Sequence, residues 1–312
     1  MSVTSRSIIH GDKKHRENYT ESVEHGENWT LHLGDCVEKT KEIPDESIHF
    51  SVFSPPFASL YTYSDSERDM GNSANTDQFF EHFKYLIHEL YRVIMPGRNC
   101  SVHRMNLPTS LTKDGVIGIR DFRGEIIRAF ADEGWIYHSE VCIWKDPVVA
   151  MQRTKALGLL YKQLKKDSCR SRQGIADYLV TFRKPGINEE PVGRKPENFP
   201  VSRWQKWASP VWMDIEQGNT LQKERDEKDE KHICPLQLDV IERAVTLWSN
   251  SGDTILSPFA GIGSEGYQSI LIGRKFVGIE LKPGYFQQAV TNLKMADINA
   301  RQQSHDLFSE GI

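Results

Sequence analysis

The 312-residue chain lacks several features that would define other classes of protein. It has no run of about 18 apolar residues, so a membrane-spanning protein is excluded. Its N-terminal stretch has no apolar segment of the kind that a secretory signal requires. The five cysteines form no CxxC pair and are odd in number, which favours reduced thiols in a cytoplasm over a disulfide framework. With 38% hydrophobic residues, the chain is expected to fold around a sizeable core.

The net charge of −4 is small, but it is unevenly distributed. Between Lys145 and Lys206 there are 14 Lys and Arg against six Asp and Glu, a local charge of +8, so the rest of the chain sums to −12. A basic block on an acidic body suits a protein that contacts phosphates with one face. The alternative is an ordinary solvated helix, and charge alone does not choose between the two.

Strand-like and helical patterns alternate along the chain. Apolar residues recur with helical spacing from Phe79 to Ile94, and the aperiodic segment 58–75 reads as a long loop of the kind that often forms a lid. Strands are predicted at 29–36, 47–53, 99–105, 135–145, 178–184, 253–259 and 274–281, and helices at 79–94, 124–134, 236–250 and 283–297. This alternation predicts an α/β fold, a mostly parallel twisted sheet with helices on both faces.

A glycine-rich turn in SPFAGIGSEG (257–266) joins a predicted strand to a predicted helix. Gly261 and Gly263 permit positive φ angles and let the backbone approach a ligand closely. Glu280 follows Gly263 by 17 residues, at the end of the next predicted strand. A carboxylate there would accept hydrogen bonds from both ribose hydroxyls of an adenosine-type ligand. Gly266 completes a GxGxxG spacing, so a bound pyrophosphate and a tight turn that binds nothing are open alternatives at this point.

A second motif, Ser54-Pro55-Pro56-Phe57, directly follows the apolar strand 47–53. Prolines have no backbone N–H, so we expect their carbonyls to stay free to accept hydrogen bonds from a ligand, together with the Ser54 hydroxyl. Such acceptors would hold an exocyclic NH₂ group and localise its lone pair, while Phe57 would stack on a flat ring. Standing alone, the tetrapeptide would more often be a proline-rich strand exit.

Together these motifs resemble those of the DNA amino-methyltransferases, which transfer a methyl group from S-adenosylmethionine to N4 of cytosine or N6 of adenine. The segment 54–57 matches the family's catalytic [DSN]-P-P-[YFW], and 259–264 matches its methionine-binding FxGxGS loop, which argues against a dinucleotide. Their order along the chain resembles the circularly permuted beta group. KHICPLQL (231–238) is similar to a further family motif, from which its Ile-Cys insert departs. The resemblance implies these cofactor-binding residues: Asp35, Phe259, Gly261, Gly263, Ser264, Glu280, His232 and Pro235.

The resemblance also implies a Rossmann-like S-adenosylmethionine-dependent methyltransferase fold with an inserted target-recognition region. It divides the chain into a polar N-terminal arm (1–28), a catalytic half (29–145), a basic recognition region (146–220) and a cofactor-binding half (221–312). Double-stranded DNA is the expected partner, with the target base turned out of the helix, and His and Cys spacings predict no metal site. Phosphate contacts are predicted at Arg153, Lys155, Lys162, Lys165, Lys166, Arg170 and Arg172. The helical stretch 156–164 is expected to pack its apolar side and project its cations.

Ser54 at the first motif position favours N4 of cytosine over N6 of adenine, a correlation carried over from the family. The alternatives are a methyltransferase for an RNA or protein amine, a DNA-binding protein that retains the fold without activity, and, last, a nicotinamide oxidoreductase. The sequence leaves open the recognition site, a restriction endonuclease companion and a homodimer. The expected location is the cytoplasm of a bacterial or phage-infected cell.

Overall fold

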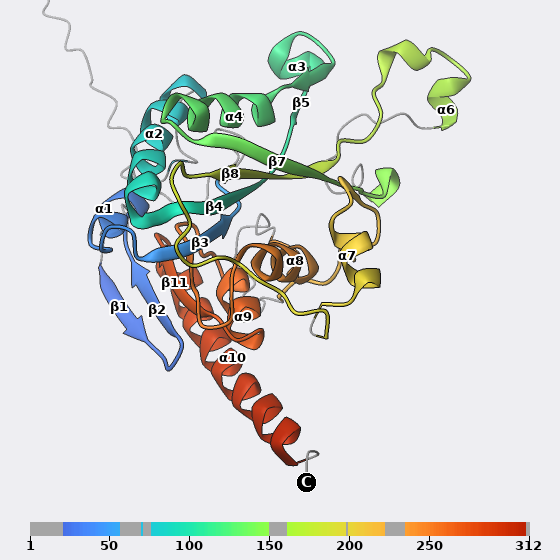
Figure 1. Ribbon diagram of the computed structural model, residues 1–312. Coiled ribbons are helices and arrows are strands. Elements are labelled where there is room, and N and C mark those ends of the chain that lie inside the picture. Colours follow the sequence, from blue (N-terminus) through green and yellow to red (C-terminus); the bar gives the residue numbers. More distant parts are fainter. Residues whose placement is uncertain are drawn as a thin grey trace, which may run out of the picture.

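The computed structural model describes residues 21–56, 70, 76–149, 161–197, 199–221 and 235–309. Their dominant feature is one nine-stranded sheet between two layers of helices (Figure 1). In spatial order the strands are β1 (Ser22–His25), β2 (Trp29–Leu33), β11 (Lys275–Glu280), β10 (Thr254–Ser257), β3 (Ile48–Phe53), β4 (Ile94–Met105), β8 (Asp177–Arg183), β7 (Ile136–Ile143) and β9 (Val211–Trp212).

The sheet is mostly parallel, as the sequence predicted. β2, β11, β10, β3 and β4 form an unbroken parallel block. Only β1 and β8 run against the other strands of this sheet. β3 has a nearly continuous apolar sequence because helices cover both faces of the sheet at its centre.

Two hydrophobic clusters fill the space on either side of the sheet. On α2, the helical spacing predicted from the sequence places Phe79, Phe83, Leu86, Ile87 and Leu90 in the core, all fully buried. One face carries α1 (Cys36–Lys41), α2 (Thr76–Val93) and α4 (Phe122–Asp132); the other carries α8 (Leu238–Trp248), α9 (Ser264–Leu271) and α10 (Pro283–Ser309) (Figure 1). None of the helices in the described ranges combines the length and the apolar character that crossing a bilayer requires.

Several short elements were not predicted, because runs of two to seven residues carry too little periodicity. A two-stranded hairpin pairs β5 (Leu107–Thr109) with β6 (Gly118–Arg120), and α3 (Leu111–Asp114) lies between these strands in the chain. The unpredicted elements are α1, β5, α3, β6, the 3₁₀ helix η3 (Ser168–Arg170), α7 (Val201–Trp207) and β9. The short helix α6 (Tyr161–Leu164) lies within the helical stretch predicted at 156–164.

The predicted segments differ from the observed architecture in two places. Part of the arm expected at 1–28 is strand: β1 pairs with β2, although all four of its residues are exposed and show no apolar pattern, as is common for an edge strand. Residues 1–20 lie outside the described ranges. The region 146–220 contributes β8 and β9 to the sheet, so only its other segments stand outside the catalytic sheet.

Candidate active site at the carboxyl edge of the sheet

β3 and β10 lie side by side at the centre of the sheet, and the chain leaves them in opposite directions. From β3 it passes through α2 to β4, and from β10 through α9 to β11 on the other side. Such a switch point leaves a crevice at the carboxyl ends of the two strands, where ligands bind in open α/β sheets. Both predicted motifs begin here. The rings of Phe53 and Phe259, whose centroids are 5.7 Å apart, bring the two strand ends together.

The glycine loop after β10 turns sharply and leaves backbone open to a ligand. Gly261 and Gly263 have φ angles of +54° and +86°. A Cβ added to Gly261 would meet no protein atom within 4 Å, whereas one at Gly263 would press on Ala289 of α10, 3.3 Å away. At Gly266 an added Cβ would lie 2.4 Å from the Phe276 ring, so this glycine lets α9 pack closely on β11. Gly261 is therefore the glycine of this loop that faces open space.

Glu280, at the end of β11, holds this loop in place. Its Oε2 accepts a hydrogen bond from the Gly261 N–H and its Oε1 one from the Lys282 N–H, both at 2.8 Å. The neighbouring Ala260 N–H donates to the Ile279 carbonyl, also at 2.8 Å. A carboxylate has about four lone-pair positions, so Glu280 can orient the loop and still accept hydrogen bonds from a ligand.

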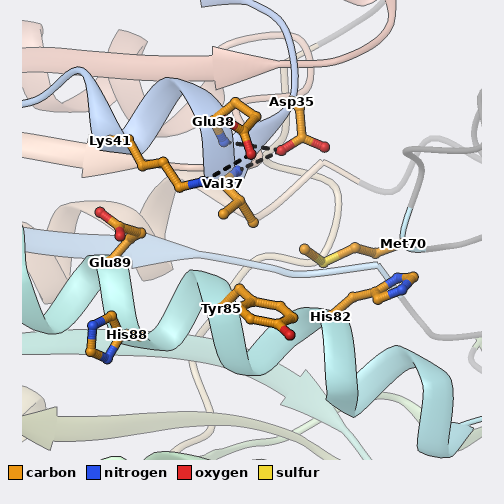
Figure 2. A pocket seen from close by; sticks show the side chains of 9 residues that line it. All are labelled: Asp35, Val37, Glu38, Lys41, Met70, His82, Tyr85, His88 and Glu89. Atoms are coloured by element: carbon orange, nitrogen blue, oxygen red, sulfur yellow. Dashed lines mark hydrogen bonds and ion pairs between the residues drawn. The ribbon is translucent and has the colours of Figure 1, made fainter.

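Asp35 lies at the same edge, because β2 pairs with β11 so that Leu33 stands opposite Glu280. Its carboxylate caps α1 by accepting the N–H groups of Val37 and Glu38 at 2.9 and 3.1 Å. Beside it, between α1 and α2, is a hollow of about 430 Å³ (Figure 2), a volume in the range of small-molecule sites. The hollow is lined by Asp35, Val37, Glu38, Lys41, Met70, His82, Tyr85, His88 and Glu89.

Two polar side chains are buried at the start of α9, directly after the glycine loop. The Ser264 hydroxyl has no hydrogen-bond partner among the described residues. Burial, reinforced by the charge of Glu280, raises the pKa of Glu265 to about 8. A buried hydroxyl without a partner, next to backbone that faces open space, is the arrangement that a polar ligand would complete. Together with Glu280, this loop fits the S-adenosylmethionine expected from the sequence.

Ser54 contacts a buried histidine on the next strand, a residue that the sequence analysis missed. Ser54 Oγ lies 3.4 Å from His103 Nδ1 and 3.4 Å from the His103 carbonyl oxygen. On the other side of the ring, His103 Nε2 lies 3.2 Å from Asp177 Oδ2, and Lys145 pairs with the same carboxylate oxygen. Burial works to raise the pKa of Asp177, but His103 and Lys145 outweigh it and the pKa is lowered. Asp177 is therefore ionised although its side chain is buried.

The second proline of the tetrapeptide departs from the prediction. The Pro56 carbonyl accepts a hydrogen bond from the guanidinium of Arg104, which is itself fully buried and lies over the Phe122 ring at 4.6 Å. The expectation that this carbonyl stays free was wrong, because a buried guanidinium requires acceptors. Pro55 is buried and Ser54 is half-buried, while Phe57 lies outside the described residues.

The predicted phosphate-binding run is described only in part. Lys162, Lys165 and Lys166 are exposed on and after α6. Arg172 is half-buried, donates to the Gln173 carbonyl at 3.0 Å, and has a pKa lowered by burial. The expectation that the apolar side of 156–164 packs was wrong where it can be followed: Tyr161 and Leu164 are 73% and 55% exposed, since α6 has only four residues. Arg153, Lys155, His232 and the Arg170 side chain lie outside the described residues; Pro235 is half-buried before α8.

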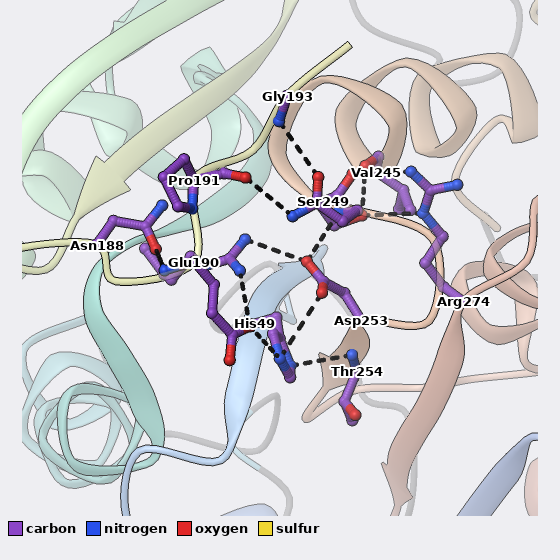
Figure 3. Close-up of polar contacts among 12 residues, drawn as sticks. His49, Asn188, Glu190, Pro191, Gly193, Val245, Ser249, Asp253, Thr254 and Arg274 are labelled. Carbon is purple, nitrogen blue, oxygen red and sulfur yellow. Dashed lines mark hydrogen bonds and ion pairs between the residues drawn. The ribbon is translucent and has the colours of Figure 1, made fainter. Parts of the chain in front are cut away.

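One His/carboxylate group with metal-like spacing occurs in the described ranges, at the opposite edge of the sheet (Figure 3). His49 Nε2 lies 3.4 Å from Glu190 and 3.7 Å from Asp253. However, the Thr254 N–H donates to His49 Nδ1 at 3.1 Å, so the hydrogen of a neutral ring is on Nε2 and that nitrogen has no lone pair for a metal. Arg98 also lies 3.1 Å from Asp253 and 3.5 Å from Glu190. The group is an internal ion-pair network.

Comparison with known proteins places this site in a family. The sequence pattern of a DNA methylase family, N6/N4, matches residues 48–291. The chain belongs to the N6/N4 DNA methylase family. Type II methyltransferase M1.MboII of Moraxella bovis is 35% identical over 275 residues, covering 86% of this chain and 98% of that protein. DNA adenine methyltransferase YhdJ of Escherichia coli (strain K12) is 23% identical over 270 residues, covering 86% and 83%.

Solved structures share the fold of this family member. TTHA0409 of Thermus thermophilus, in complex with S-adenosylmethionine, has a TM-score of 0.62 at 21% identity and covers 86% of this chain and 95% of its own. PvuII DNA methyltransferase (cytosine-N4-specific) has a TM-score of 0.58 at 15% identity, covering 88% and 92%. The predicted family, the methyltransferase fold and the cofactor S-adenosylmethionine are confirmed, and the chain is a DNA methyltransferase. A nicotinamide oxidoreductase is thereby set aside.

Proposed function

We propose that this DNA methylase transfers a methyl group to N4 of cytosine in double-stranded DNA, on a base turned out of the helix. The observation that carries the proposal is the position of Ser54: it leaves the carboxyl end of β3 at the switch point, next to the glycine loop after β10. A neutral hydroxyl at this place is the feature that favours cytosine.

In this proposal the target amine is held by the tetrapeptide. Ser54 Oγ and the Pro55 carbonyl would accept its two hydrogens, because the Pro56 carbonyl is already engaged by Arg104. Phe57 would stack on the base. Bound S-adenosylmethionine supplies an electrophilic methyl group, and the chain's contribution is to hold the amine in line with it and keep water away.

The cofactor would lie along the carboxyl ends of β10, β11 and β2. Gly261 leaves space for its methionine part, and Ser264 offers a buried hydroxyl without a partner among the described residues. Glu280 would accept the ribose hydroxyls, and Asp35 would border the adenine part beside the hollow between α1 and α2. Phe259, Gly263 and Pro235 shape this side of the crevice, and His232 is proposed from the sequence alone.

The DNA backbone would be contacted by the exposed lysines that follow β7. The segment 161–176 leads directly into the start of β8, which is antiparallel to β4 and β7, so it enters the sheet at the same edge as Ser54. Lys162, Lys165 and Lys166 would neutralise phosphates there, and the exposed Tyr161 offers an aromatic surface among them.

Adenine N6 is the alternative target, favoured by the similarity to a relative named as a DNA adenine methyltransferase. The deciding measurement is mass spectrometry of nucleosides from duplex DNA treated with the purified protein and S-adenosylmethionine. We expect N4-methylcytosine, and Ser54→Ala should make little of it. N6-methyladenine would overturn the cytosine assignment. Bound cofactor without any methylated base would indicate a DNA-binding protein without activity.

A further inference from the structure

We propose that His103 is a positioning and proton-accepting residue for Ser54, held in the required tautomer by Asp177. The proposal rests on the proposed role of Ser54 at the target amine, and it deepens that role for either base. Three elements that are distant in sequence form the arrangement: Ser54 follows β3, His103 lies on β4, and Asp177 begins β8. His103 and Asp177 are 7% and 2% exposed, so solvent does not decide their orientation.

The carboxylate favours one ring nitrogen as the carrier of the hydrogen. Asp177 is ionised and can only accept. Its Oδ2 lies 3.2 Å from His103 Nε2, an ion-pair contact whose N–H is not yet aligned for a hydrogen bond, and this charge favours the hydrogen of a neutral His103 ring on Nε2. Nδ1 is then a bare acceptor toward Ser54 Oγ at 3.4 Å. The other acceptor for this hydroxyl, the His103 carbonyl oxygen, is also on β4. In either case the hydroxyl hydrogen points into the sheet, and the lone pairs of Ser54 Oγ remain for the amine.

The charges around the ring support this tautomer. Lys145, after β7, pairs with the same Asp177 oxygen and, like His103, favours the ionised carboxylate. Arg104, the next residue on β4, sends its guanidinium to the Pro56 carbonyl and so fixes the tetrapeptide from the other side. Distances of 3.4 Å at Ser54 are long for hydrogen bonds, and catalytic contacts of this kind commonly tighten when substrate binds.

The arrangement also accounts for the proton that the reaction releases. As the N–C bond forms and the S–C bond breaks, the sulfonium becomes a neutral thioether and the amine nitrogen must lose one proton. That proton passes to Ser54 Oγ while the hydroxyl hydrogen passes to His103 Nδ1. The resulting imidazolium is stabilised beside the Asp177 carboxylate, and it returns the proton to solvent after the product leaves. No further co-reactant is needed.

The tautomer can be measured without cofactor or DNA. Nitrogen-15 NMR of the histidine-labelled protein should show Nε2 protonated and Nδ1 bare for His103, with the signals assigned by their absence from His103→Asn. In Asp177→Asn, Lys145 would keep the amide oxygen and leave the NH₂ group facing the ring, so the tautomer should reverse. A wild-type ring with its hydrogen on Nδ1 would overturn the proposal.

Kinetics provide the second readout, with His49→Asn as the matched control because His49 faces an aspartate at the opposite edge. The rate of single-turnover methyl transfer should fall roughly 100-fold in His103→Asn, the lower end of the usual range for proton transfer. The wild-type rate should depend on pH because a proton passes to His103, and this dependence should be absent from His103→Asn. The affinity for S-adenosylmethionine should be unchanged. His49→Asn should keep both the rate and the pH profile.

A wild-type rate and pH profile in His103→Asn would overturn the proposal, and so would a rate loss explained by lost cofactor affinity. If His103→Asn does not fold, the wild-type tautomer and the pH profile of Asp177→Asn decide in its place. Failure of the proposed function is distinguishable, because it shows as the absence of any methylated base with the wild-type chain.

Discussion

Two histidines on adjacent strands show how the two edges of the sheet differ. His49 lies near the amino end of β3 and faces Asp253, while His103 lies near the carboxyl end of β4 and faces Asp177. Both aspartates are buried, and each also pairs with a cation. Each edge thus has a histidine, a buried aspartate and a cation, so the chemistry of the two edges must be decided by something else.

The difference is the partner of the second ring nitrogen. At the amino edge, His49 Nδ1 accepts the backbone N–H of Thr254, a group that cannot take a proton back. At the carboxyl edge, His103 Nδ1 faces the Ser54 hydroxyl, which both donates and accepts. A His–Asp pair therefore holds strand ends together at one edge and reaches a group that could exchange a proton at the other.

The amino edge is also closed by a chain segment, whereas the carboxyl edge leaves backbone open. The segment after β8 crosses the strand ends, where Asn250 donates to the Pro191 carbonyl at 3.2 Å and accepts the Gly193 N–H at 3.3 Å (Figure 3). At the other edge Gly261 faces open space. Buried charge alone therefore does not mark a functional site, whereas a group that is left available to a ligand does.

The largest effect is expected from a pair of glycine substitutions, one at each edge of the sheet. Gly261 and Gly252 both have positive φ, and an added Cβ meets nothing within 4 Å at either position. Gly261→Val and Gly252→Val should therefore carry a similar strain of roughly 1–3 kcal/mol. Only Gly261→Val should lose S-adenosylmethionine binding, to below detection in calorimetry. Equal cofactor affinity in the two variants would mean that the loop is merely structural.

The amino edge should respond in stability instead of binding. Asp253→Asn leaves the buried Arg98 with Glu190 as its remaining carboxylate, at 3.5 Å. Removing one partner of a buried ion pair costs about 3–5 kcal/mol, so urea unfolding should show a loss of about 3 kcal/mol or more. The affinity for S-adenosylmethionine of the folded variant should match the wild type. A weakened affinity would show that the two edges are energetically coupled and would contradict the contrast between them.

A smaller, pH-dependent effect is expected at Glu265 on the carboxyl edge. Its folded pKa of about 8 lies above the ordinary value of 4.5, so its stabilising contribution is complete below pH 4.5 and is lost as the pH rises through 8. Wild-type unfolding free energy should fall across this window by a few kcal/mol, with a slope on the order of 1.4 kcal/mol for each pH unit at most. In Glu265→Gln the unfolding free energy should fall less steeply with pH. An unchanged slope in that variant would mean that other groups cause the pH dependence.

The sequence predicted the elements that carry strong patterns. The apolar run of β3 and the helical spacing on α2 gave their positions, and the two motifs were placed at strand ends that the structure brings together. This works because core burial imposes a period on each element. β1 was not predicted, because it is an exposed edge strand with no apolar face.

His103 and Asp177 could not be paired from the sequence, because their contact depends on register. β4 and β8 are antiparallel, with His103 opposite Leu179 and Asp177 opposite Met105. A shift of one residue in this pairing would send one side chain to the other face. A signal was nevertheless present: charged residues inside strands that are otherwise buried require partners, and His103, Arg104 and Asp177 are such residues.

The smallest effect is expected from surface lysines, and it extends the comparison to DNA. Lys162 and Lys166 are exposed at the carboxyl edge, and Lys275 and Lys294 are exposed elsewhere, on β11 at the amino edge and on α10. Replacing the first pair by alanine should weaken binding to every DNA sequence and flatten the slope of log affinity against log salt by about one for each phosphate that is no longer neutralised. Replacing the second pair removes the same charge but should leave the slope unchanged, because counterion release depends on where a cation lies and net charge alone does not produce it.

Binding measured by fluorescence anisotropy over a salt series checks both variants on one duplex. If both pairs change the slope equally, the effect is one of overall charge and the carboxyl edge is not the DNA-binding side.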